Sequence, residues 1–160
     1  MPQRRSPPVG TDEGKQTMDI CEEIRSARSA GSVRCCIAPG VATLEQLAAD
    51  SGLSTGSQLY HEIRADAARR LAFLILTKDL AYDCVVVAPA RADSLLARFF
   101  AVFGSHDVRY FTNGTFHEAP AESPTHSGVT WQPATAATFD TGILIVGPIA
   151  SGVLWVEDED

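Results

Sequence analysis

The most regular segment of the sequence is TGILIVGPIASGVLWVE, residues 141–157. Its two ends, Thr141–Val146 and Val153–Glu157, are rich in β-branched and aromatic residues, which favour strands. Gly147–Gly152 between them contains the glycine and proline residues that are typical of a connection between strands. The segment therefore predicts two antiparallel strands joined as a hairpin.

Further strands and helices are predicted on the N-terminal side of this hairpin. Val108–Thr112 and Thr115–Glu118 flank Asn113-Gly114, which suits a type I′ turn and predicts a second hairpin. Helical or strand-like periodicity marks the earlier elements. The expected helices are Asp19–Ala30, a helix capped by Thr43 that ends at Asp50, one long helix from Ser57 to Ile75, and a helix containing Leu95–Phe103; the expected strands are Ser32–Ala38 and Cys84–Ala88.

Helices thus cluster before Gly104 and strands follow it. This order predicts an α+β fold, in which N-terminal helices pack on a mostly antiparallel sheet built largely from the C-terminal half. A length of 160 residues with 45% hydrophobic side chains suits one domain, which we place at residues 18–160. Residues 1–17 contain three prolines, two glycines and few side chains that could form a core, so we predict a disordered leader there.

The charged residues are distributed unevenly along the chain. Residues 1–110 carry 13 basic and 13 acidic side chains, whereas residues 111–160 carry seven acidic side chains and no lysine or arginine. The net charge of 13 − 20 = −7 therefore arises in the last third of the chain. Such a charge repels phosphate groups and attracts basic surfaces, so we predict a basic protein partner and no binding to nucleic acid.

An aromatic residue beside carboxylates at the end of a sheet is typical of a surface that binds a basic protein. The expected contact residues are Trp131, Asp140, Trp155, Glu157, Asp158, Glu159 and Asp160. We expect a non-enzymatic binding protein, namely a bacterial immunity or antitoxin-type inhibitor whose acidic surface faces a basic toxin or nuclease. The alternative for these residues is core packing for the tryptophans and solubility for the acidic tail.

The segment TLEQLAADSGLS, Thr43–Ser54, resembles the first helix and turn of bacterial helix-turn-helix regulators. The resemblance implies DNA binding through residues 43–64, and it stays open as an alternative function. A recognition helix needs cationic and amide side chains near its N-terminus. Ser54–Glu62 offers only Gln58 and His61 for this purpose.

Motifs for catalysis or metal binding are incomplete. Gly52–Gly56 matches the G-x-S-x-G pattern of hydrolases, but a helix rather than a strand is predicted before it. His61-Glu62 begins an H-E-x-x-H pattern whose second histidine is replaced by Ala65. We therefore predict no catalytic residue, metal or cofactor, while an enzyme with an unrecognised site remains a further alternative.

The cysteines and the hydropathy pattern bear on the compartment. Cys21, Cys35, Cys36 and Cys84 form no C-x-x-C pair, and we expect reduced, mostly buried thiols. No apolar stretch approaches the roughly 18 residues that a membrane span needs, and Arg4-Arg5 precedes a polar segment instead of an apolar one. We therefore expect a cytoplasmic protein without a membrane partner.

Overall fold

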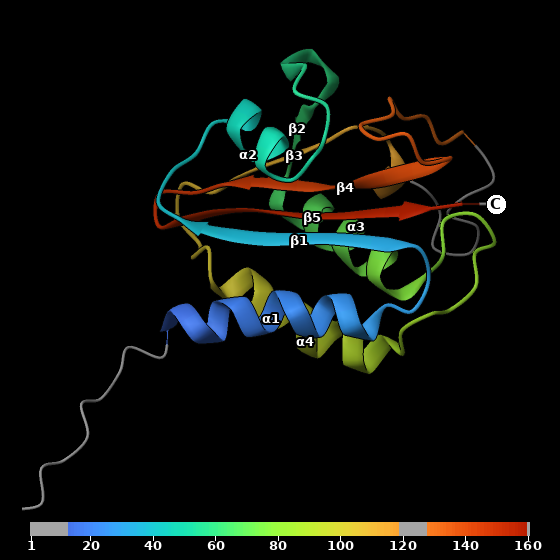
Figure 1. Ribbon diagram of the computed structural model, residues 1–160, viewed down its shortest axis with the longest axis horizontal. Helices are drawn as coiled ribbons and strands as arrows, with labels where there is room; N and C mark the ends of the chain where they lie inside the picture. The colour runs from blue at the N-terminus through green and yellow to red at the C-terminus, as the bar shows by residue number, and fades with distance from the viewer. Residues whose placement is uncertain (1–12, 119–127, 160) are drawn as a thin grey trace, which may run out of the picture.

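The computed structural model describes residues 13–118 and 128–159, which form an antiparallel sheet with helices on both faces (Figure 1). Within these residues the five strands pair in the order β1-β5-β4-β3-β2. The strands are β1 Ser32–Pro39, β2 His61–Ile63, β3 Arg109–Thr112, β4 Phe139–Val146 and β5 Ala150–Asp158. The helices are α1 Glu13–Ala27, α2 Leu44–Asp50, α3 Ala65–Thr77 and α4 Pro89–Ala101, with 3-10 turns η1 Ser57–Leu59 and η2 Phe116–Glu118. The predicted α+β fold is confirmed.

The hairpin of β4 and β5 forms the centre of the sheet, as the sequence predicts. Ile143 pairs with Leu154, and the register continues to Phe139 opposite Asp158. Both faces of β5 lie in the core. Leu154 faces α1, α3 and α4, whereas Trp155 faces α2, and both side chains are buried.

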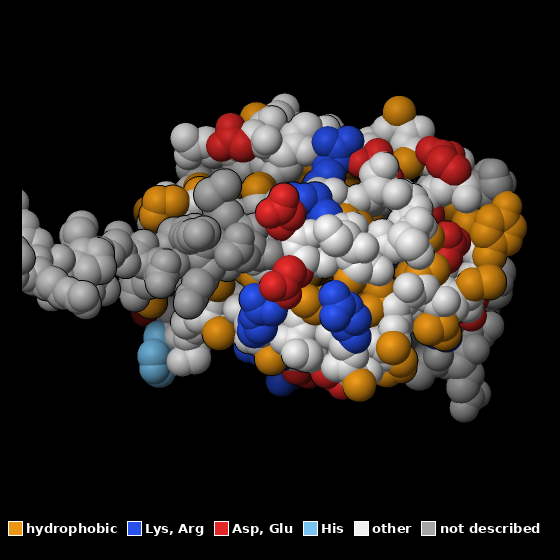
Figure 2. Space-filling view, turned by 60° about the horizontal axis from the view of Figure 1, so that its bottom comes forward, with side chains coloured by type: hydrophobic (Ala, Val, Ile, Leu, Met, Phe, Trp, Pro, Cys, Tyr) orange, Lys and Arg blue, Asp and Glu red, His pale blue; other side chains and the backbone are white. Residues whose placement is uncertain are grey.

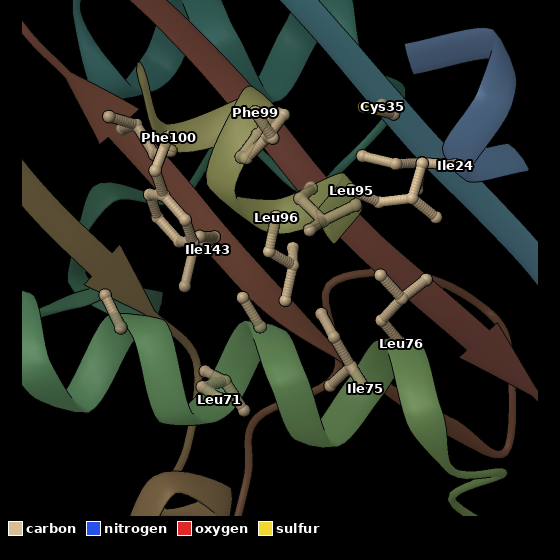
Figure 3. Packing of buried hydrophobic residues seen from close by; sticks show 14 of the residues in the cluster. Ile24, Cys35, Leu71, Ile75, Leu76, Leu95, Leu96, Phe99, Phe100 and Ile143 are labelled. Carbon is tan, nitrogen blue, oxygen red and sulfur yellow. The ribbon is translucent and has the colours of Figure 1, made fainter. Parts of the chain in front are cut away.

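The larger core lies between the sheet and the layer of α1, α3 and α4 (Figure 3). The helix predicted at Leu95–Phe103 is α4, which ends at Ala101; its apolar stripe of Leu95, Leu96, Phe99 and Phe100 is buried there. Pro89 begins the helix. Proline has no backbone N–H, and at this position an N–H would have no acceptor within the helix, so no hydrogen bond is lost. The stripe faces Ile143 of β4 and the buried side of α3.

The helix α2 covers the opposite face of the sheet (Figure 1). Thr43 caps it by accepting a hydrogen bond from the backbone N–H of Gln46 at 3.1 Å, which confirms the predicted start. The helix ends before Gly52, whose φ of +72° suits a residue without a side chain. Leu47 and Ala48 place their side chains against the sheet.

The prediction of one long helix from Ser57 to Ile75 is wrong. The chain forms η1, then the edge strand β2, and enters α3 only at Ala65. Tyr60 packs on the α2 face of the sheet, whereas Ala68 packs on the opposite face. A continuous helix could not pack on both faces of the sheet. Instead, β2 pairs with β3 at the edge of the sheet, and the chain passes from one face to the other there.

Two predicted strands are also absent from the described residues. Cys84–Ala88 forms a single bridge, between Val85 and Lys78, instead of a strand. Thr115–Glu118 does not return along β3, because β2 and β4 already occupy both edges of that strand. The predicted Asn113-Gly114 hairpin is therefore wrong, and Gly114 forms a bridge with Trp131 instead.

The first helix begins at Glu13, six residues before the predicted start at Asp19. Most of the predicted leader, residues 1–12, lies outside the described residues. In the described part of the chain, no helix combines the length and apolar character needed to cross a bilayer.

Candidate functional site

The expected contact residues Trp155 and Asp140 lie inside the protein. Both are 0% exposed, so they do not contribute to the protein surface. The indole Nε1–H of Trp155 donates to Asp140 Oδ1 at 3.2 Å. A side chain on Gly142, which lies opposite Trp155, would collide with the indole ring and the β5 backbone. The missing side chain of Gly142 is therefore what makes room for the tryptophan.

Asp140 organises a buried polar network on the α2 face. Its Oδ1 accepts hydrogen bonds from the backbone N–H of Ala134 at 3.0 Å and from Asn113 Nδ2 at 3.1 Å. Its Oδ2 accepts from the N–H and the hydroxyl of Thr135, at 3.2 and 3.0 Å. The carboxylate thus holds the segment before β4 against the sheet, which is a structural role.

Asn113 extends this network, and Tyr60 lies close enough to feel the charge of Asp140. Asn113 Nδ2 also donates to the carbonyls of Gln132 and Asp140, at 2.8 and 3.0 Å, and Thr141 Oγ1 donates to Asn113 Oδ1 at 2.8 Å. Burial, and then the negative charge of Asp140, raise the pKa of Tyr60 to about 12. From the sequence, Asn113 is predicted only as a turn residue, because an Asn-Gly pair is typical of a turn and gives no sign of a buried amide.

Asp158 is also buried, in an ion pair with Arg28. Both side chains are 0% exposed, and the two contacts measure 2.7 Å (Nη1 to Oδ1) and 2.6 Å (Nη2 to Oδ2). Arg28 further donates to the carbonyls of Ile75 and Lys78, at 2.6 and 3.0 Å. No local sequence pattern marks Arg28, since its partners are up to 130 residues away.

The remaining expected residues divide between the surface and the core. Glu157 pairs with Arg34 of β1, and Glu159 accepts hydrogen bonds from Thr138. Trp131 is half-buried, with its ring centroid 5.2 Å from Phe116 and 5.5 Å from Phe139. Asp160 lies outside the described residues. The six expected residues that the structure describes therefore do not meet in one exposed surface.

An exposed aromatic residue beside carboxylates does occur, in residues 78–88, the α3–α4 loop. Tyr82 and Val85 are each 64% exposed; Asp79 and Asp83 flank Tyr82 in sequence, and Val85 lies two residues after Asp83. Figure 2 shows hydrophobic side chains next to acidic ones at the right-hand end of the molecule, the end at which Figure 1 draws this loop. This site is not predicted from the sequence, where Cys84–Ala88 is interpreted as a strand.

The α3–α4 loop is held in a defined conformation. Asp79 Oδ1 accepts from the backbone N–H groups of Ala81 and Tyr82, at 2.7 and 2.9 Å. Asp79 N–H donates to the Cys84 carbonyl at 2.9 Å, which closes the loop. Asp83 adopts a φ of +58° and pairs with Lys78 at 3.5 Å. These bonds reduce the entropy that the loop would lose on binding a partner.

The buried ion pair of Arg28 and Asp158 forms hydrogen bonds with the backbone of this loop. Asp158 Oδ2 accepts a hydrogen bond from the backbone N–H of Leu80 at 2.8 Å, and Leu80 is fully buried. Arg28 binds the Lys78 carbonyl at the start of the same loop. Asp158 is predicted from the sequence to lie on the binding surface. Its side-chain carboxylate instead anchors the loop that contains Tyr82.

Other candidate chemistry is dispersed. Among residues 13–118 and 128–159, no group of three or more histidine, cysteine or acidic side chains is arranged to hold a metal ion. The G-x-S-x-G segment lies after a helix, and the Ser54 N–H donates to the Ala134 carbonyl at 2.9 Å. The segment that would form a recognition helix after Gly52 contains η1 and β2 instead.

Comparison with known protein families, curated proteins and solved structures gives no match for this chain.

Proposed function

We propose that this chain is a non-enzymatic binding protein that uses the α3–α4 loop to dock a basic protein. The observation that carries the proposal is the exposure of Tyr82 and Val85 on a hydrogen-bonded loop, in which Tyr82 lies between Asp79 and Asp83 and Val85 follows them. Tyrosine is enriched among the residues that dominate binding energies at protein interfaces. A rigid loop presents such a side chain at a low entropic cost.

The charge of the protein supports a basic partner. The net charge of −7 attracts a cationic protein over long distances and speeds its encounter. At the docking site itself, two carboxylates and the single ammonium group of Lys78 leave an excess negative charge. An inhibitor of a nucleic-acid-cleaving toxin fits this charge, since its target carries a cationic surface for phosphate groups.

The test begins with tagged wild-type protein used to capture partners from its native host. A captured basic protein is then purified, and its dissociation constant is measured at two ionic strengths. We expect Tyr82→Ala to raise the dissociation constant roughly 30-fold, as for a residue central to an interface. We also expect binding to weaken as the salt concentration rises. If the partner is a nuclease, adding the wild-type protein in equal amount should inhibit it.

The chain offers a matched control at the other end of the sheet. Val41 and Ile149 are 74% and 66% exposed, and they lie next to β1 and β5 at the ends far from Asp158. The double variant Val41→Ser/Ile149→Ser should bind as the wild type does. Equal binding by the Tyr82→Ala variant, or loss of binding only in the control, would contradict the proposal.

A further inference from the structure

Two cysteines that are distant in sequence meet inside the larger core. Cys21 lies in α1 and Cys35 in β1, and they are 4% and 6% exposed. Their Sγ atoms are 2.7 Å apart. Figure 3 shows Cys35 on β1 beside Ile24, which lies one helical turn after Cys21. Cys36 faces the opposite side of the sheet, where its sulfur lies 3.2 Å from the Ser51 hydroxyl.

The distance between the two sulfur atoms is close to that of a covalent bond. A disulfide bond measures about 2.05 Å, so the sulfur atoms need to approach by less than one ångström. Both residues are free thiols in this structure. We propose that Cys21 and Cys35 form a redox pair that closes into an intramolecular disulfide when the protein meets a peroxide.

The surroundings assign different roles to the two thiols. The Cys35 thiol donates its hydrogen to Cys21 Sγ. This hydrogen bond lowers the pKa of Cys21; burial opposes the effect, and the positive charge of Arg25 adds to it. The pKa of Cys35 is raised, first by the same hydrogen bond and then by burial. Cys21 is therefore the attacking thiolate and Cys35 the resolving thiol.

The reaction proceeds in two steps whose atoms and electrons balance. The Cys21 thiolate attacks one oxygen of hydrogen peroxide, the O–O bond breaks, and the product is a sulfenic acid while the other oxygen leaves as water after taking up a proton. The Cys35 sulfur then attacks the Cys21 sulfur, and the sulfenic hydroxyl leaves with the Cys35 proton as a second water. Two thiols lose two electrons and two hydrogens, and one peroxide is reduced to two waters.

The bond would fasten α1 to the edge strand of the sheet. Cys21 and Cys35 are 14 residues apart, and closing such a loop shifts the folding equilibrium toward the native state by on the order of 100-fold. Arg28 follows α1 directly, four residues before the start of β1, and belongs to the ion pair that contacts the α3–α4 loop. Oxidation thus raises the stability of the helix that leads into this support.

The test treats the folded wild-type protein with hydrogen peroxide and then counts free thiols by alkylation after unfolding. We expect two of the four cysteines to become unavailable and the intact mass to fall by that of two hydrogen atoms. Trypsin cleavage after Lys15, Arg25, Arg34 and Arg64 places Cys21 in peptide 16–25 and both Cys35 and Cys36 in peptide 35–64. A non-reducing digest should link these two peptides, and a reducing agent should separate them.

The double variant Cys36→Ala/Cys84→Ala is the control, because it retains only the proposed pair. It should lose both thiols and gain thermal stability on oxidation, whereas Cys35→Ala should form no internal link. Four free thiols in the treated wild type, a link that requires Cys36 or Cys84, or oxidation of Cys21 to a sulfinic acid without a link would each overturn the proposal.

Discussion

Arg28 and Asp158 form a two-contact ion pair that is fully buried between the end of α1 and the end of β5. Three of the remaining polar contacts of this pair go to backbone groups in or next to α3: Ile75, Lys78 and Leu80. One ion pair thus joins the first helix, the last strand and the α3–α4 loop.

Asp158→Asn should destabilise the protein by about 3–5 kcal/mol, because it leaves the buried Arg28 guanidinium without a compensating charge. Chemical denaturation measures the free energy of unfolding. Glu159→Gln, at the exposed neighbouring position, should change it by less than about 0.5 kcal/mol. A loss below about 1 kcal/mol for Asp158→Asn would show that the ion pair contributes little.

Trp155→Ala should cost about 3–5 kcal/mol, since it removes a fully buried aromatic ring and opens a cavity above Gly142. Trp155→Phe should cost less, but it removes one of the donors to Asp140. The free energies of unfolding of both variants are obtained from denaturant titrations. Wild-type stability in Trp155→Ala would place the indole outside the core.

Ionisation of Tyr60 should make the protein less stable in alkali. Its folded-state pKa of about 12 lies above the ordinary value of 10.0, so the unfolded chain releases this proton at a lower pH than the folded chain. The stability contribution is fully present below pH 10 and is lost as the pH rises toward 12. Denaturation at a series of alkaline pH values measures this loss.

Two variants of this network test the origin of the pH dependence. Tyr60→Phe should show a smaller loss of stability in alkali than the wild type. Asp140→Asn should lower the pKa of Tyr60 while leaving it above 10.0, because burial is the larger cause of the shift and the charge of Asp140 the smaller. A tyrosine absorbance titration that is unchanged in Asp140→Asn would contradict the contribution of this charge.

Phe99→Ala should destabilise the protein by about 3–5 kcal/mol. Phe99 is fully buried in α4, and its ring lies 5.2 Å from that of Phe103 and 5.5 Å from that of Phe100. Ser94→Ala on the exposed side of the same helix is the control and should have little effect. Similar unfolding midpoints for the two variants would mean that burial of Phe99 in the apolar stripe of α4 contributes little to stability.

Local patterns were sufficient where a residue's partners are close in sequence. The Thr43 cap acts on Gln46, three residues away, and the hairpin of β4 and β5 joins neighbouring segments. The stripe of α4 repeats at helical spacing along a single helix. These features depend on short-range hydrogen bonds and on periodicity, which the sequence displays directly.

The errors arose where a distant partner outweighs the local preference. His61–Ile63 continues a helical pattern but pairs with β3, almost 50 residues away. Asn113 has the sequence context of a turn, yet its amide bonds to Asp140 inside the protein. Pairing and burial of this kind depend on which segments meet in space, and secondary-structure propensity is too weak to oppose them.

The sequence by itself determined the α+β class, the central hairpin, the capped helix α2, the apolar stripe of α4 and the concentration of negative charge after Arg109. Only the tertiary structure decided where that charge lies. Asp140 and Asp158 are buried because backbone donors and Arg28 from distant segments satisfy their carboxylates. In the same loop Leu80 is buried in the larger core, with its N–H bound to Asp158, whereas Tyr82 is exposed. Burial of a charge depends on its partners in space, which no local pattern records.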